Sequence, residues 1–436
     1  MKKIIFASII FFSCFSHAGT GIKNLFIEKR ERVIIFAPHP DDEILGCASL
    51  IQKVIKNEGE VFVVYLTNGD HNQVPYRVYE KKIILKPADY VKLGEIRRKE
   101  STKATGILGV PQENLIFLGY PDFGCLRIWE DFWGNVKKPF MSFLTRARYV
   151  PYRENFSFGQ PYVAESILND LKKIITQLKP TKIFITSPFD TNTDHRALYN
   201  FVRAAILEIK EIRVEVFIYI IHFKNYPQKK SEFLMLPEIP SVYETFLVPL
   251  DNEEVSKKDE ALSCFKSQTV FKKGWFFSFA RKNEIFYKEK DENINENRML
   301  ALESEKEAEF KDYRNASYPF YCTLKKDGEL LNIEFIQRDK IDLLTEYIFY
   351  FYPFRNDTEF SAMPKIKVNL KKEKEIISGG YGFIRENLKY EKLKNRISFR
   401  VNISDLKNPD YLFFSATIKV GGISYDFIPW EVIKIE

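Results

Sequence analysis

Apolar and polar residues follow two different periods along the first two thirds of the chain. Short apolar runs rich in β-branched residues predict buried strands at 33–37, 60–67, 114–118, 182–186 and 214–221. Between them, apolar residues recur at helical spacing over 44–54, 88–108, 162–178 and 195–209. Strands that alternate with helices predict an α/β fold, namely a Rossmann-like, mostly parallel sheet with helices on both faces.

The pattern changes in the last third of the chain. Runs rich in β-branched and aromatic residues predict strands at 331–336, 347–354, 397–403, 412–420 and 423–435. Val420-Gly421-Gly422-Ile423 predicts a hairpin turn between the last two. We therefore expect an all-β, sandwich-like accessory domain over 311–436, after a highly charged connector with helical propensity at 287–310. Three aromatic residues are candidates for stacking on sugar rings, with a place in the core as the alternative: Tyr411, Tyr425 and Trp430.

The N-terminus has the pattern of an export signal. A basic start precedes an apolar run over 4–15 and the small-residue pattern Ser16-His17-Ala18, which predicts a signal peptide over 1–18. The apolar run is shorter than the roughly 20 residues that a membrane-spanning helix needs. We expect an exported, periplasmic or extracellular protein without a transmembrane span. A lipoprotein acylated at Cys14 is the alternative, which the preceding Phe-Phe-Ser disfavours.

Charge and cysteine content narrow the class of partner. The formal charge of +7 over 436 residues is mild, and the 66 basic and 59 acidic residues are interspersed. This pattern excludes a nucleic-acid-binding footprint but is compatible with peripheral contact with an anionic envelope surface. The four cysteines after the signal lack CxxC spacing, so they predict no zinc knuckle. Disulfide pairing and buried thiols both remain open for them.

Chemically suggestive residues follow two of the predicted strands. The first strand runs into Pro38-His39-Pro40 and then into three acidic residues that open a helix, and the strand at 182–186 runs into a segment that ends at His195. Such acidic residues often only cap a helix. However, the carboxyl ends of parallel strands lie at one edge of a sheet. His39, Asp42 and His195 would then provide two imidazoles and a carboxylate, a set that suits a catalytic zinc with one open position.

A family resemblance supports this interpretation. Residues 37–43, Ala-Pro-His-Pro-Asp-Asp-Glu, resemble the AHPDDE motif, with one Pro inserted, of the PIG-L/LmbE-like zinc-dependent N-deacetylases. Further elements agree in order over residues 30 to 285: Thr-Asn-Gly at 67–69, R-x-x-E at 97–100, Leu-Gly-Tyr-Pro-Asp at 118–122, a D-x-H-x-D-H-like element at 190–195, and Lys-Ser-Gln at 266–268. The resemblance assigns 19–286 to a deacetylase domain.

The resemblance also implies roles for individual residues. The zinc ligands would be His39, Asp42 and His195, the general base Asp41, and a substrate-contacting residue Arg97. Asp122 and Asp190, which belong to two of the motifs, are expected to bind substrate. Asp194 is expected to orient a ligand imidazole. The implied reaction is removal of an N-acetyl group from an N-acetylhexosamine-containing glycan or glycolipid by zinc-activated water.

One position departs from the family pattern. The first His of D-x-H-x-D-H is Asn192 here, and an amide can donate a hydrogen bond to an oxyanion but cannot protonate a leaving amine. We therefore expect Asn192 to stabilise the oxyanion and His71 to act as the proton donor, with His222 as the second candidate. A zinc amidase on another acylated amine, or a carbohydrate-binding protein with a weakened site, are the alternative functions.

The segment from 122 to 160 has no clean periodicity but contains several arginines and aromatic residues, among them Trp129. Long loops of this kind are usually functional. Because this segment leaves the carboxyl end of a predicted strand, we expect it to be a substrate-binding lid that includes Trp129. The alternative is a merely structural insertion.

Overall fold

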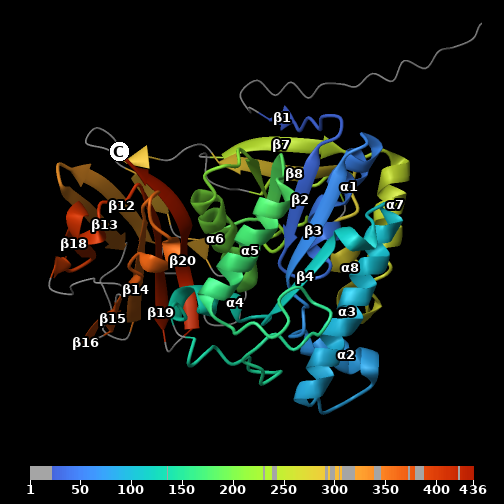
Figure 1. Ribbon diagram of the computed structural model, residues 1–436, viewed down its shortest axis with the longest axis horizontal. Coiled ribbons are helices and arrows are strands. Elements are labelled where there is room, and N and C mark those ends of the chain that lie inside the picture. The colour runs from blue at the N-terminus through green and yellow to red at the C-terminus, as the bar shows by residue number, and fades with distance from the viewer. Residues whose placement is uncertain are drawn as a thin grey trace, which may run out of the picture.

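The computed structural model describes residues 22–134, 136–228, 231–237 and 243–289, and in the C-terminal part 293–294, 300–303, 305–306, 320–337, 345–371, 374–378, 387–420 and 423–436. The predicted signal peptide and the two glycines of the predicted hairpin lie outside these residues. Two bodies stand side by side in Figure 1, a sheet covered by helices and an all-β part. None of the described helices combines the length and apolar character needed to cross a bilayer.

One eight-stranded sheet organises the N-terminal body. Its strands are β1 (Lys23–Asn24), β2 (Arg32–Ala37), β3 (Glu60–Thr67), β4 (Leu115–Tyr120), β5 (Lys182–Thr186), β6 (Glu215–Tyr219), β7 (Tyr243–Pro249) and β8 (Asn283–Glu289). They lie in the order β1-β7-β8-β6-β5-β2-β3-β4. The run from β6 to β4 is parallel, whereas β8 is antiparallel to both of its neighbours. The predicted, mostly parallel α/β sheet is confirmed, and the sequence pattern missed β7 and β8.

Helices cover both faces of this sheet. They are α1 (Asp42–Lys56), α2 (Gln73–Glu80), α3 (Pro87–Ile107), α4 (Cys125–Asp131), α5 (Ala164–Leu178), α6 (Thr193–Glu208), α7 (Asn252–Leu262) and α8 (Lys266–Phe277). Figure 1 shows α5 and α6 on one face and α1, α3 and α7 on the other. A proline at its first position fixes the start of α3, and the side chain of Asn192 caps α6 by accepting a hydrogen bond from the backbone N–H of Asp194.

The chain order creates a crevice at one edge of the sheet. From β2 the chain proceeds through β3 to β4 on one side, and then returns to place β5 and β6 on the other side of β2. The loops after β2 and β5 therefore diverge at a topological switch point, where open α/β sheets bind ligands. The predicted metal ligands lie there: His39 in the loop after β2, and Asp42 and His195 in the first turns of the helices that follow the two loops, α1 and α6.

The C-terminal body is a β-sandwich. Its strands are β9 (Asn293–Ile294), β10 (Leu300–Glu303), β11 (Glu305–Lys306), β12 (Phe320–Asp327), β13 (Leu330–Gln337), β14 (Thr345–Phe354), β15 (Ile366–Lys371), β16 (Lys374–Ser378), β17 (Lys389–Lys392), β18 (Arg396–Asn402), β19 (Tyr411–Val420) and β20 (Ile423–Ile435). One sheet has the order β10-β12-β13-β18-β17 and the other β11-β20-β19-β14-β15-β16. All five strands predicted from the sequence are present here.

The predicted connector at 287–310 is wrong as a separate element. Its described residues are strands: β8 extends to Glu289, β9 and β11 pair with β20, and β10 pairs with β12. Local helical propensity is a weak preference, and the unpaired backbone groups at the sheet edges offer these residues hydrogen bonds instead. The β body therefore begins before residue 311.

The two bodies share one core. Trp129 of α4 is fully buried, and its ring centre lies 5.6 Å from that of Trp430, 5.7 Å from that of Tyr352 and 5.8 Å from that of Phe413. The hydroxyl of Tyr352 donates to the backbone oxygen of Glu130 at 3.0 Å. Trp430 is consequently an interface residue, and its expected role in sugar stacking is corrected.

Candidate metal centre

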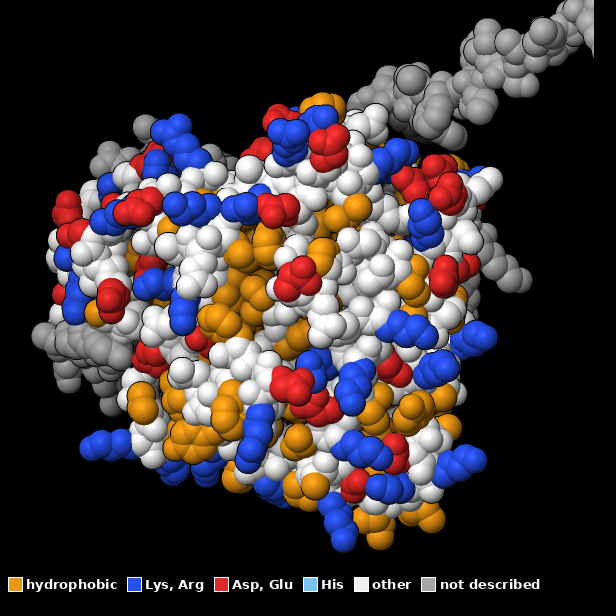
Figure 2. All heavy atoms as spheres, turned by 45° about the vertical axis from the view of Figure 1, so that its right-hand side comes forward, with side chains coloured by type: hydrophobic (Ala, Val, Ile, Leu, Met, Phe, Trp, Pro, Cys, Tyr) orange, Lys and Arg blue, Asp and Glu red, His pale blue; other side chains and the backbone are white. Residues whose placement is uncertain are grey.

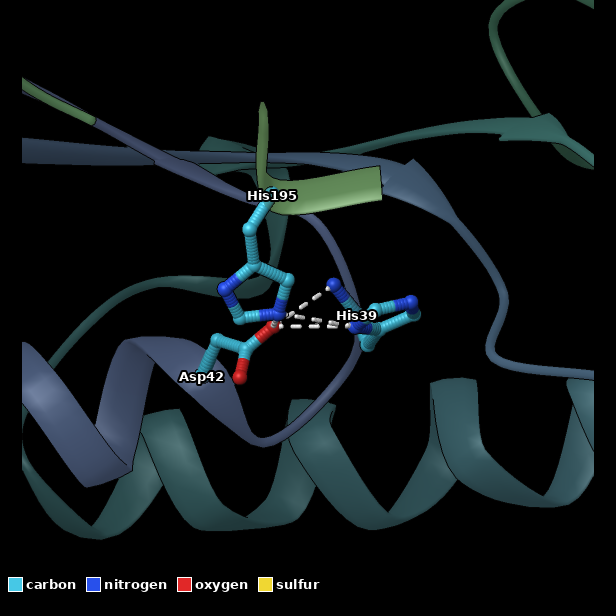
Figure 3. A group of neighbouring side chains, drawn as sticks. All are labelled: His39, Asp42 and His195. Atoms are coloured by element: carbon cyan, nitrogen blue, oxygen red, sulfur yellow. Dashed lines mark hydrogen bonds and ion pairs between the residues drawn. The ribbon is translucent and has the colours of Figure 1, made fainter. Parts of the chain in front are cut away.

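Three polar atoms meet at the switch point (Figure 3). The Nδ1 of His39 lies 3.1 Å from Oδ2 of Asp42 and 3.3 Å from Nε2 of His195, and that Nε2 lies 3.1 Å from the same oxygen. All three side chains are buried. Ligand atoms about 2.0–2.1 Å from a tetrahedral zinc are roughly 3.3 Å apart. The spacing and the donor types therefore fit zinc, as the sequence predicted.

Carboxylates lie behind both imidazoles. The Nδ1 of His195 is 3.0 Å from Oδ2 of Asp190, and the Nε2 of His39 is 3.2 Å from Oδ1 of Asp122 and 3.4 Å from Oδ2 of Asp194. Such partners hold a ligand imidazole in one orientation and leave its other nitrogen for the metal. Burial alone would lower the pKa of His195, but Asp190 and Asp42 raise it to about 9. The surroundings thus favour positive charge at this point.

This arrangement revises two predicted roles. Asp190 is fully buried, and its Oδ2 also accepts hydrogen bonds from the backbone N–H groups of Ile221 and His222. It orients His195 and has no surface for a substrate, so its expected substrate contact is wrong. Asp122 borders the cavity, but its oxygens face His39 and the backbone N–H of His71. The expectation that Asp194 orients a ligand imidazole agrees with its place behind His39.

Asp41 lies beside the three ligand atoms without belonging to them. It precedes α1 with φ 144°, a conformation that L residues rarely adopt and that is found mostly at functional sites. Its Oδ2 accepts a hydrogen bond from Nη2 of Arg97 at 2.8 Å. Burial raises the pKa of the Asp41 carboxyl to about 7, although Arg97 acts in the opposite direction. A carboxyl with a pKa near neutrality is suited to general-base catalysis.

Arg97 is held by backbone oxygens as well as by Asp41. Its guanidinium donates to the oxygens of Gly69 and Pro40, each at 2.9 Å, and the residue is buried. A Cβ on Gly69 would lie 2.1 Å from Nη1 of Arg97, and Gly69 also has φ +67°. Only glycine fits there. Arg97 thus fixes Asp41 first of all, and it also borders the cavity, where its predicted substrate contact stays a prediction.

Two of the sequence motifs join distant helices. Glu100 of α3 accepts hydrogen bonds from the backbone N–H and the hydroxyl of Ser267, at 2.8 and 2.6 Å. The neighbouring Gln268 accepts a hydrogen bond from Nδ2 of Asn72 at 2.6 Å, in the loop after β3. The R-x-x-E and Lys-Ser-Gln motifs therefore anchor α8 beside the crevice.

A cavity of about 560 Å³ opens over His39 and Asp42. Its floor includes His39, Asp41 and Asp42, and its outer walls come mainly from α2 and α8, with Val74, Arg77, Phe271 and Trp275 among the residues. Its size is that of a small-molecule site. The sequence pattern predicted neither wall, because α2 carries no motif and the Lys-Ser-Gln motif at the start of α8 does not indicate where that helix packs.

The three candidates for proton transfer and oxyanion binding all border this cavity. The side-chain oxygen of Asn192 caps α6, which leaves its NH₂ group as the donor. His71 packs against Phe123, with ring centres 4.8 Å apart. His222 is stacked on Trp275, and burial lowers its pKa to about 4. At neutral pH it therefore carries no extra proton, which argues against it as the general acid.

Comparison with known proteins identifies the N-terminal body. Residues 34–206 match the family described as PIG-L: GlcNAc-PI de-N-acetylase. These residues therefore form a PIG-L domain. The chain is also 24% identical over 188 residues to a putative glucosamine-6-phosphate deaminase-like protein of Bacteroides thetaiotaomicron, a match that covers 40% of this chain and 28% of that protein. The family resemblance drawn from the motifs is confirmed.

Several solved structures are similar to the PIG-L body. A deacetylase of the teicoplanin biosynthetic pathway has a TM-score of 0.40 and 15% identity, covering 59% of this chain and 97% of its own. The N,N'-diacetylchitobiose deacetylase of Pyrococcus horikoshii has a TM-score of 0.37 and 19% identity, with coverages of 59% and 82%. A 4-carboxy-2-hydroxymuconate hydratase from Pseudomonas putida reaches 0.36 and 16%, with coverages of 57% and 82%.

The predicted lid of the PIG-L domain is wrong. Among the described residues between 122 and 160, only Asp122 and Phe123 border the cavity. Trp129 is buried between the two bodies, so its predicted role in substrate binding is corrected. Farther along, the hydroxyl of Tyr152 donates to Asp70 at 2.6 Å, behind the loop after β3. The rings of Trp129 and Tyr152 fill the core, because burial of their large apolar area is favourable, whereas Phe143 and Tyr149 are exposed without bordering the cavity.

Proposed function

We propose that this protein is a zinc-dependent N-deacetylase that removes the acetyl group from an N-acetylhexosamine unit of a glycan or glycolipid. One observation carries the proposal: a carboxyl that does not belong to the ligand set, Asp41, stands beside a buried His-Asp-His group with the spacing of a zinc site. The family match over residues 34–206 supports deacetylation as the reaction class.

The proposed mechanism divides the work among a few side chains. His39, Asp42 and His195 would hold the zinc, which when bound acts as a Lewis acid and makes water more acidic. Asp41 takes a proton from the attacking water, and its pKa of about 7 allows it to do so at neutral pH. Arg97 keeps the Asp41 carboxyl in place through the 2.8 Å hydrogen bond.

The tetrahedral oxyanion and the leaving amine need further groups. The NH₂ of Asn192 is free to donate, since its oxygen is engaged at the start of α6. Asp41 holds the proton that the water has lost and can return it to the amine nitrogen. His71, at the cavity wall, is the proposed second proton donor.

The cavity supports a sugar as the substrate. Trp275 and Phe271 offer apolar ring faces, and Arg77, Asn72 and Gln268 offer polar groups at the same wall. Sugar rings present both apolar C–H faces and hydroxyl groups, so a wall of this mixed kind is suited to them. A zinc amidase acting on another acylated amine is the second candidate, which the same catalytic group would serve.

Two measurements test the proposal. Metal analysis of the purified protein should give one zinc per chain, and His195→Ala should lose it. Acetate release should be measured over a panel of N-acetylated sugars and other acylated amines. We expect Asp41→Asn to keep the metal and lose about 10²–10⁴-fold in turnover.

Asp89→Asn is the matched control, because Asp89 is also an acidic residue at the start of a helix but lies in an exposed capping box. Unchanged acetate release by Asp41→Asn would show that Asp41 is not the general base and has only a structural place before α1. Sugar binding without any turnover would favour a carbohydrate-binding protein. Export stays a separate proposal, tested by finding Gly19 at the N-terminus of the mature protein.

A further inference from the structure

Large aliphatic side chains project into solvent on α2 and in the segment that follows it. Ile83 and Ile84, which follow α2, are 88% and 78% exposed, and Val74 and Val78 on α2 are each about half exposed. Phe271 on the adjacent α8 is 56% exposed. We call α2, residues 81–86 and the exposed residues of α8 the α2 surface. Contiguous exposed apolar side chains of this kind mark an interaction site.

Basic side chains surround these aliphatic residues. Residues 73–92 contain five basic and two acidic side chains. The two acidic ones are already engaged, since Asp89 pairs with Lys82 at 2.7 Å and Glu80 pairs with Lys92 at 2.9 Å. In Figure 1, α2 protrudes at the lower end of the molecule, and Figure 2 shows orange and blue side chains predominating at that end. The α2 surface is therefore both apolar and positively charged.

The α2 surface is continuous with the catalytic cavity. Val74, Arg77 and Phe271 border the cavity and are also exposed at its mouth. Anything that covers the α2 surface thus lies directly in front of the entrance, beyond which stand the proposed zinc ligands.

We propose that the α2 surface docks on a lipid bilayer that contains anionic lipid. Burial of the aliphatic side chains in the interfacial region of the bilayer lowers the free energy of binding, and so does the attraction of the lysines to anionic headgroups. A second copy of the chain fits less well, because a symmetric contact would bring these basic residues together.

Vesicle sedimentation with the full mature chain tests docking. Wild type should sediment with equimolar phosphatidylcholine and phosphatidylglycerol, and much less with phosphatidylcholine alone. Ile83→Asp/Ile84→Asp should lower the partition coefficient at least about tenfold, the effect of withdrawing one buried aliphatic side chain. Lys81→Glu/Lys86→Glu should also release the protein. Phe26→Asp is the matched control, since Phe26 is 75% exposed and follows β1 at the opposite end of the molecule.

Wild type that stays in the supernatant, or a double isoleucine variant that binds like wild type, would overturn the proposal. So would self-association in sedimentation velocity that the isoleucine variant abolishes. Acetate release from a soluble N-acetylated sugar tests the deacetylase function independently of membrane docking. It should be equal in wild type and in the isoleucine variant, and its absence in both would count against the deacetylase while the vesicle result stands.

Discussion

Replacement of Trp129 by alanine should destabilise the PIG-L domain and the β-sandwich together. The indole is fully buried, and its ring centre lies 5.0 Å from that of Phe201 on α6, 5.4 Å from that of Phe360 and 5.6 Å from that of Trp430. It therefore touches both bodies at once. Truncation of a buried Trp to Ala typically costs about 3–5 kcal/mol. Compared with a total of about 5–15 kcal/mol, this is a large share of the stability.

The assay is urea unfolding followed by two probes. One is hydrogen exchange in the central strands of both bodies, and the other is zinc release to a chromogenic chelator. The backbone N–H of Cys125, at the start of α4, donates to Asp194 at 3.0 Å, and Asp194 stands behind His39. Because α4 links the interface to the ligand set, metal release should coincide with unfolding of the shared core.

Two variants serve as references for Trp129→Ala. Phe26→Ala, at an exposed position, should change the free energy of unfolding by less than about 0.5 kcal/mol. Phe399→Ala, in the separate core between the two β-sheets, should shift the same single transition if the bodies unfold as one unit. A loss below about 1 kcal/mol for Trp129→Ala, or two separate transitions in wild type, would refute the shared core. Two transitions would restore the expectation that residues from 311 onward fold on their own.

Three further predictions concern single side chains. Asp190→Asn should weaken zinc binding about 10–100-fold in a chelator competition, because the carboxylate 3.0 Å from His195 orients that ligand. Asp170→Asn is the control and should leave zinc binding unchanged, since the Asp170 carboxylate accepts a hydrogen bond from Tyr120 instead. Arg97→Lys should keep zinc but lower turnover, since a lysine cannot reproduce the three hydrogen bonds to Gly69, Pro40 and Asp41; Arg98→Lys is its control, and equal rates would contradict the positioning role. Burial holds the pKa of Lys365 well below its usual range. At alkaline pH the unfolded chain therefore binds more protons than the folded chain. The free energy of unfolding should consequently rise with pH up to the pKa of an unfolded lysine, about 10.4. Lys365→Met should show a smaller rise between pH 7 and 10, and parallel curves would rule out this lysine as the cause.

The elements and the location of the chemistry could be predicted from the sequence. The apolar runs at 60–67 and 182–186 coincide with β3 and β5, because a strand buried on both faces needs an unbroken apolar run. His39 and Asp42 follow one such strand and His195 follows another. Parallel strands end at the same edge, so the meeting of these three residues follows from chain order and local pattern alone.

Several site contacts could not be predicted in this way. Asp122, Asp190 and Asp194 are all acidic residues after strands, and nothing local indicates which imidazole each one faces. The structure places Asp190 behind His195, and Asp122 with Asp194 behind His39. The cavity walls from α2 and α8 are equally non-local, since α8 is fixed there by the contact of Ser267 with Glu100.

The sequence by itself determined the α/β and all-β parts and the residues at the switch point. Only the tertiary structure decided which aromatic residues are core, which strands extend the β-sheets, and how the two bodies join. Trp129 and Trp430 are of a residue type that often stacks on sugar rings, but their rings are buried against each other. The physical reason is that periodicity records how deeply a side chain is buried, whereas its partner depends on long-range packing that the pattern does not contain.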